Sequence, residues 1–249
     1  MSSTSTGARR DSGAWFVTTH WSAVLSAGRS DTSGAQQALE HLCQTYWFPL
    51  YAYVRRRGYS PEDAQDLTQE FFARLLEGDR VRSADQQKGR FRSFLLTGMN
   101  NFLADEWDKA HAQKRGGGMR PVPLQFDTAE SRYGSEPIDN VTPEQSFERR
   151  WALTLLDDVL KRLGAEHERE GKADMFAALN PCLVGDRTSQ PYLELAQRLG
   201  MTESAIKSAV HRLRRRYRQL LREEIANTVA SPDEVDDELG HLFTVLARG

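Results

Sequence analysis

The sequence predicts an all-α protein, in which two small helical domains are joined by a flexible linker and the second domain contains a helix-turn-helix. Apolar residues recur at spacings of three and four through most of the chain, as on one face of a helix. No clear run of alternating apolar residues, the usual sign of a strand, is present. Residues 116–148 hold a glycine run and four prolines without periodicity, and so separate the two helical blocks.

The composition favours a cytoplasmic protein that does not contact a membrane. No apolar run approaches the roughly 18 residues that a membrane span needs, and the Ser/Thr-rich N-terminus lacks the apolar core of a secretory signal. Cys43 and Cys182, the two cysteines, have neither the spacing of metal ligands nor that of a disulfide scaffold. They fit a reducing compartment.

The first domain is expected over residues 39–115, after an N-terminal extension of residues 1–38. Helical spacing begins at residues 39–54, where Pro49 is expected to bend or restart the helix. The run Ser60-Pro61-Glu62-Asp63 predicts a second helix start, with a capping serine, a first-turn proline and acids near the positive end of the helix dipole. A third helix is expected over about residues 90–113.

Two faces of these helices are candidates for binding. The second helix places Asp63, Asp66 and Glu70 on one stripe, which on composition alone is usually a solvated face. Beside it, the pattern places Thr68 in an exposed position. The third helix mixes basic and aromatic residues with the pair Asn100–Asn101, a combination that suits unpaired bases. Two alternatives stay open, because Trp107 also suits a core and Asn101 also suits a cap or a local turn bond.

The second domain is expected over residues 149–226 and ends in the helix-turn-helix. Ala196 is the small residue needed where its helices touch, and Gly200 is the glycine of the turn. Thr202 is placed to cap a second helix running to about Glu224. The core positions of the motif are filled by Leu195, Leu199, Met201, Ile206 and Ala209.

Charge is distributed unevenly at this end of the chain, although the net charge is only −2. Residues 198–222 hold eight basic residues against one acid, and residues 223–249 hold seven acids against one arginine. The basic block predicts DNA binding, with base contacts near the start of the second helix and phosphate contacts further along it. The candidates are Thr202, Ser204, Lys207, Ser208, His211, Arg212, Arg214 and Arg215, with Arg216 and Arg218 as further phosphate contacts. The alternative is a helix hairpin with a solvated basic face.

The acidic tail, residues 227–249, is an addition to this domain and contains a short helix candidate at residues 239–246. As a hypothesis, the tail folds back on the basic helix and screens it from DNA.

Taken together, these segments resemble bacterial RNA polymerase sigma factors of the extracytoplasmic-function group, over about residues 40–115 and 150–225. The segment D-A-Q-D-L-T-Q-E-F-F resembles their helix for the polymerase clamp, F-R-S-F-L-L-T-G-M-N-N-F-L-A-D resembles their −10 reader, and the helix-turn-helix resembles their −35 reader. Gln65 stands where the clamp motif usually has a second acid, which reduces the docking charge.

The resemblance implies partners and roles. Core RNA polymerase would be bound through its clamp and flap regions, and promoter DNA both as duplex and as melted strand; an anti-sigma factor or another regulator is a further expected type of partner. The clamp contacts would be Asp63, Asp66, Gln69, Glu70 and Phe71. Asn101 would capture a flipped base, and the neighbouring strand would be lined by Arg92, Asn100, Trp107, Lys109, Lys114 and Arg115.

No catalytic or metal-binding constellation is present in the sequence. The six histidines lack metal spacing, and residues 116–118 lack the Lys-Ser/Thr of a phosphate loop. We therefore expect no enzyme, no metal and no cofactor. Two other functions remain open, a stand-alone helix-turn-helix regulator of duplex operators and an interaction module that sequesters a partner.

Overall fold

The computed structural model describes residues 33–76, 90–112, 133, 141–184, 192–229 and 231–247, which are almost wholly helical. No strand occurs in these ranges, so the predicted all-α class is confirmed. The predicted N-terminal extension up to residue 32 and most of the predicted linker lie outside the described residues.

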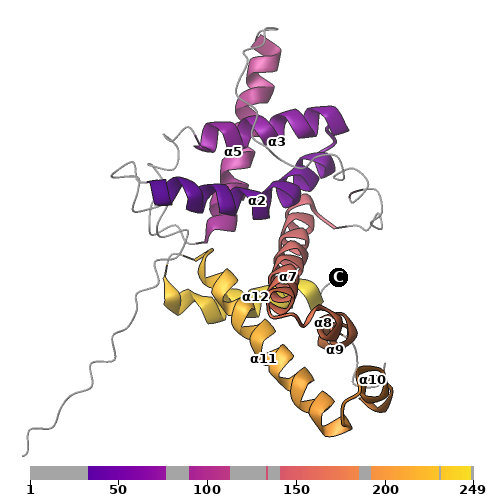
Figure 1. Cartoon of the computed structure of the whole chain (residues 1–249). Helices are drawn as coiled ribbons and strands as arrows, with labels where there is room; N and C mark the ends of the chain where they lie inside the picture. Colours follow the sequence, from indigo (N-terminus) through magenta and orange to yellow (C-terminus); the bar gives the residue numbers. More distant parts are fainter. Residues whose placement is uncertain are drawn as a thin grey trace, which may run out of the picture.

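The first helical block consists of α2 (Ser33–Arg56), α3 (Pro61–Leu76) and α5 (Phe91–Ala112) (Figure 1). The predicted cap of α3 is present, since the Asp63 amide donates to the Ser60 hydroxyl at 3.1 Å. Helix α2 continues through Pro49, so a restart at this proline does not occur. Aromatic rings fill the core of the block, with Phe71 and Phe102 at 5.8 Å between centroids.

Helix α7 (Pro143–Arg169) is the longest helix of the described residues and begins inside the predicted linker. The prediction that residues 116–148 form a flexible linker is therefore wrong from Pro143 onward. The physical reason is a capping box, in which the Gln145 amide donates to the Thr142 hydroxyl at 3.2 Å and the Gln145 side chain accepts from the Thr142 amide at 3.1 Å. Phe147, also in the predicted linker, is fully buried.

The remaining helices are α8 (Ala173–Leu179), α9 (Pro181–Val184), α10 (Tyr192–Leu199), α11 (Glu203–Ala226) and α12 (Val235–Ala247), with a short 3-10 turn at Pro232–Glu234. Gly200 joins α10 to α11 with a φ of +63°, a conformation that suits glycine. Ala196 is buried, and the Thr202 hydroxyl accepts from the Ala205 amide at 3.2 Å. The predicted small contact residue, turn glycine and cap are all confirmed.

Helix α7 connects the two ends of the chain by packing against both. It contacts α2 on one side and α11 and α12 on the other (Figure 1). The Tyr53 and Phe147 rings meet edge to face at 6.4 Å, and Trp151 is fully buried. One hydrophobic cluster therefore runs from α2 to α12. The division into two domains stays a prediction, and the structure adds that α7 is the helix against which both blocks pack.

Candidate nucleic-acid interface

The predicted acidic stripe lies on the outer side of α3. Asp63 and Asp66 are exposed, and Gln69 and Glu70 are half-buried. Glu70 pairs with Arg74, whose guanidinium also reaches Glu106 of α5 at 2.9 Å and lies 4.8 Å from the centre of the Phe102 ring. The stripe is thus an acidic surface whose C-terminal end, at Glu70, is tied to α5 through Arg74.

Two residues of α3 do not lie where the sequence pattern placed them. Phe71, predicted to contact polymerase, is only 4% exposed because its ring packs on Phe102 and against Gly98. Thr68, predicted to be exposed, is fully buried, and its hydroxyl donates to the Ala64 carbonyl at 2.7 Å. Both belong to the inner side of α3, so neither is available to a partner in this conformation.

Helix α5 presents two of its predicted nucleic-acid residues to solvent. Asn101 is exposed in the middle of the helix, so it does not cap a helix end. Trp107 is 59% exposed, so it is not a core residue. An exposed indole beside polar side chains suits stacking on an unpaired base. The side chain of Lys109, and Lys114 and Arg115 as whole residues, lie outside what the structure describes.

Asn100 is held in one orientation by two donors from α2 and the turn after it. The Tyr53 hydroxyl donates to the Asn100 Oδ1 at 2.5 Å, and the Arg57 guanidinium donates to the same oxygen. Burial raises the pKa of Tyr53, so its phenol remains a donor at neutral pH. Because both donors take the carbonyl oxygen, the amide NH₂ is the part of Asn100 left to donate to a ligand.

Arg92, predicted to line the melted strand, is turned inward. It is 6% exposed, its Nε donates to the Glu238 Oε1 at 2.7 Å, and its Nη1 pairs with Glu148. In this conformation the side chain is therefore part of a buried ionic cluster and does not face solvent.

Helix α11 presents a stripe of exposed polar and basic residues. All of the eight predicted duplex-binding residues except Arg214 are exposed. Apart from the cap Thr202, they lie at helical spacings of three and four along one side of α11: Ser204, Lys207, Ser208, His211, Arg212 and Arg215. Thr202 is exposed as well but uses its hydroxyl as the helix cap. This exposed stripe, which Arg218 continues, is the candidate duplex-facing surface.

Two of the predicted phosphate-binding arginines face the protein. The Arg214 guanidinium donates to the Cys182 carbonyl at 2.6 Å from Nη2 and 3.1 Å from Nε. Arg216 makes a bidentate pair with Glu166 of α7, at 2.6 and 2.8 Å. The hydrogen bond from Arg216 lowers the pKa of Glu166, so the pair is charged at neutral pH. Consecutive helical residues point in different directions, so a run of arginines cannot all face DNA.

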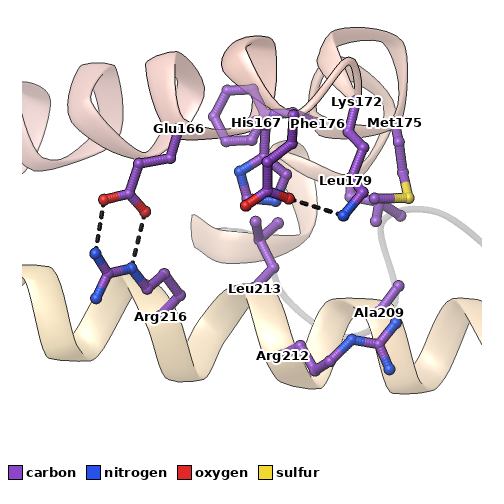
Figure 2. A pocket seen from close by; sticks show the side chains of 11 residues that line it. Glu166, His167, Lys172, Met175, Phe176, Leu179, Ala209, Arg212, Leu213 and Arg216 are labelled. Atoms are coloured by element: carbon purple, nitrogen blue, oxygen red, sulfur yellow. Dashed lines mark hydrogen bonds and ion pairs between the residues drawn. The ribbon is translucent and has the colours of Figure 1, made fainter.

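The pair Arg216–Glu166 closes one side of a hollow between α7, α8 and α11 (Figure 2). This hollow has a volume of about 430 Å³, and its apolar lining comes from Met175, Phe176 and Leu179 of α8 and from Leu213 of α11. The hollow also borders Arg212 of the exposed stripe, and the bonds to Glu166 direct Arg216 toward α7.

We expect Arg215→Ala and Arg216→Ala to have different effects on DNA binding. Loss of the exposed Arg215 should weaken duplex binding several-fold and reduce the salt slope by about 1, with an unchanged melting temperature. Loss of Arg216 should lower the free energy of unfolding by about 1 kcal/mol and leave the salt slope unchanged. Salt titrations of duplex binding, with thermal melts, measure both. An equal loss of slope in the two variants would contradict this assignment.

Within the described ranges, no group of three or more His, Cys, Asp and Glu side chains is placed to hold a metal ion. None of the described helices combines the length and apolar character required to cross a bilayer.

No curated protein and no solved structure gives a significant match to this chain. A family model does match, that of sigma-70 region 2, over residues 35–113. This range contains α3, α5 and all of α2 except its first two residues. It therefore includes the acidic stripe and the part of α5 that carries Asn100, Asn101 and Trp107, here called the Asn–Trp surface. Sigma-70 factors are non-enzymatic proteins of transcription initiation. The matched residues, about a third of the chain, are therefore similar to region 2 of sigma factors of the sigma-70 family.

Proposed function

We propose that this chain is an extracytoplasmic-function sigma factor, which binds core RNA polymerase in the cytoplasm and directs initiation at promoters through their −10 and −35 elements. The observation that carries the proposal is the succession of three exposed surfaces along one chain. These are the acidic stripe of α3, the Asn–Trp surface of α5 and the basic stripe of α11. The first two lie within the residues that match sigma-70 region 2.

The acidic stripe is the proposed contact with the polymerase clamp. The second domain expected from the sequence, residues 149–226, is the proposed contact with the flap. Asp63 and Asp66 are exposed on one side of α3 and supply carboxylates for a basic partner surface. Phe71 supports the stripe from inside, since its buried ring fixes α3 on α5.

The surface of α5 is the proposed −10 reader. Asn100 offers its amide NH₂ as an oriented donor, Asn101 is exposed beside it, and Trp107 offers a ring for stacking. Flipping a base costs a few kcal/mol, which contacts of this kind and binding to polymerase offset.

The stripe of α11 is the proposed −35 reader. Ser204, Lys207, Ser208 and His211 lie near the N-terminal half of the helix, where side chains reach base edges in the major groove. Arg212, Arg215 and Arg218 lie further along and would bind phosphate in a salt-dependent manner.

Run-off transcription with purified core polymerase on genomic fragments tests the proposal. The expected result is initiation at defined sites that share both promoter elements, and only when the chain is added. A folded chain that supports no initiation on any fragment would contradict the proposal. The alternative, a stand-alone regulator, predicts duplex binding without co-purification of polymerase, and it leaves the surfaces of α3 and α5 without a role.

A further inference from the structure

A buried ionic cluster lies where the first turn of α5 meets α7 and α12. Glu238 of α12 is fully buried and accepts from two arginines at the start of α5, at 2.8 Å from the Arg90 Nε and 2.7 Å from the Arg92 Nε. Arg92 also pairs with Glu148 of α7, which in turn contacts His241 of α12. Two glutamates thus occupy the cationic start of α5.

The main chain joins the same elements. The Phe91 amide, between the two arginines, donates to the Thr228 carbonyl at 3.0 Å. The Arg92 guanidinium lies 5.3 Å from the centre of the Trp151 ring of α7. The start of α5 is therefore closed from one side by α7 and from the other by the C-terminal segment.

The closed side of α5 continues toward its proposed strand-binding residues. Arg92, Asn100 and Trp107 are separated by eight and seven residues, and at 100° per residue they fall within roughly 80° of one another around the helix. Near the middle of this side, the Glu144 carboxylate of α7 lies 3.3 Å from the Tyr53 hydroxyl, the group that orients Asn100. Carboxylates of α7 (Glu144, Glu148) and α12 (Glu238) therefore lie along the side of α5 on which the DNA strand is proposed to bind.

We propose that Arg90 and Arg92 are a phosphate-binding pair for the melted promoter strand, and that Glu238 occupies this pair in the free chain. A guanidinium binds a carboxylate and a phosphate with the same donor geometry, so the two anions compete for one site. Helix α12 must then withdraw before a strand reaches the start of α5. The inference rests on the proposed role of α5 as the −10 reader.

The position of the tail corrects the hypothesis that it screens the basic helix. The ion pair between α12 and α11 joins Asp236 to Arg222 at 2.5 Å, near the C-terminal end of α11. The stripe from Ser204 to Arg218 remains exposed. The tail therefore packs over the start of α5 and leaves the duplex-facing stripe of α11 exposed.

Glu238→Gln in the full chain tests the inference, because it removes the competing charge and keeps the size of the side chain. Binding of a fluorescent oligo-dT strand should tighten roughly tenfold, as for one newly available charge-assisted contact. The salt dependence should steepen by about 0.7 for each phosphate gained. The matched control is Asp237→Asn, an exposed neighbour with the same change of charge, for which we expect a change within about twofold. Adding Arg92→Gln to Glu238→Gln should abolish the gain.

Equal strand affinities of a folded Glu238→Gln chain and the Asp237→Asn control would overturn the inference, and the cluster would then be structural only. If the Glu238→Gln chain does not fold, the inference is tested by hydrogen exchange of the Phe91 amide in the unaltered chain. Saturating oligo-dT should accelerate this exchange, because withdrawal of the C-terminal segment breaks the bond to Thr228. Unchanged protection would overturn the inference. Either failure leaves run-off transcription intact, so it is distinguishable from failure of the proposed function.

Discussion

Replacement of Trp151 by alanine is expected to lower the free energy of unfolding by about 3–5 kcal/mol, as for other large-to-small changes in a core. The indole is fully buried in α7 and lies beside the Arg92 guanidinium and, at 6.3 Å between ring centres, the His241 ring of α12. The change therefore leaves a cavity at the place where α5, α7 and α12 meet. Urea denaturation followed by far-UV circular dichroism measures the loss.

The same helix offers a control for this experiment. Leu153 is two residues away and 45% exposed, so Leu153→Ala should cost less than about 1 kcal/mol. If the two variants lose the same free energy, Trp151 does not have the core role assigned to it. We also expect the Phe91 amide to exchange faster in Trp151→Ala, because the contact that holds the start of α5 is weakened.

Reversal of two charges on α3, Asp63→Arg with Asp66→Arg, is expected to weaken binding to core polymerase about 100-fold, which corresponds to about 2.7 kcal/mol. Both side chains are exposed, so the new arginines face a basic partner surface without disturbing the core. Asp63 also accepts from the Ser60 hydroxyl at 2.9 Å, so a small loss of stability at the start of α3 is expected as well. Surface-immobilised core polymerase and titrated chain give the affinity.

The control for this pair is Glu168→Arg with Asp233→Arg, which reverses two exposed charges outside α3. It shifts the net charge by the same amount, and we expect it to bind polymerase within about threefold of the unaltered chain. Equal weakening by both double variants would mean that net charge, and not the α3 stripe, controls the interaction.

Local pattern was sufficient for the helical class and for several helix ends, among them the starts of α3, α5 and α11. The α3 start follows from Ser60-Pro61, because a serine cap and a first-turn proline satisfy the end of a helix without help from distant residues. The turn between α10 and α11 follows from Gly200 and Thr202 for the same reason. The capping box at the start of α7 is also a local signal, but the prolines and glycines before it favoured the prediction of a linker.

Residue types also predicted which surfaces are candidates for binding. Exposed faces carry Asp63 and Asp66 of α3, Asn101 and Trp107 of α5, and the polar start of α11, as the helical period indicates. Those faces could be found from one helix at a time, since a period of 3.6 residues places side chains on one side or the other.

Only the tertiary structure decided which of the predicted binding residues of α3, α5 and α11 face the protein interior. Phe71, Arg92, Arg214 and Arg216 are directed by partners on other helices, and no local pattern contains those partners. Glu238 shows this most clearly, since it lies in an acidic tail whose composition predicts exposure to solvent. It is buried because Arg92, 146 residues earlier in the chain, neutralises its charge. A buried carboxylate needs such a partner, and a pairing across that separation exists only once α5, α7 and α12 have packed together.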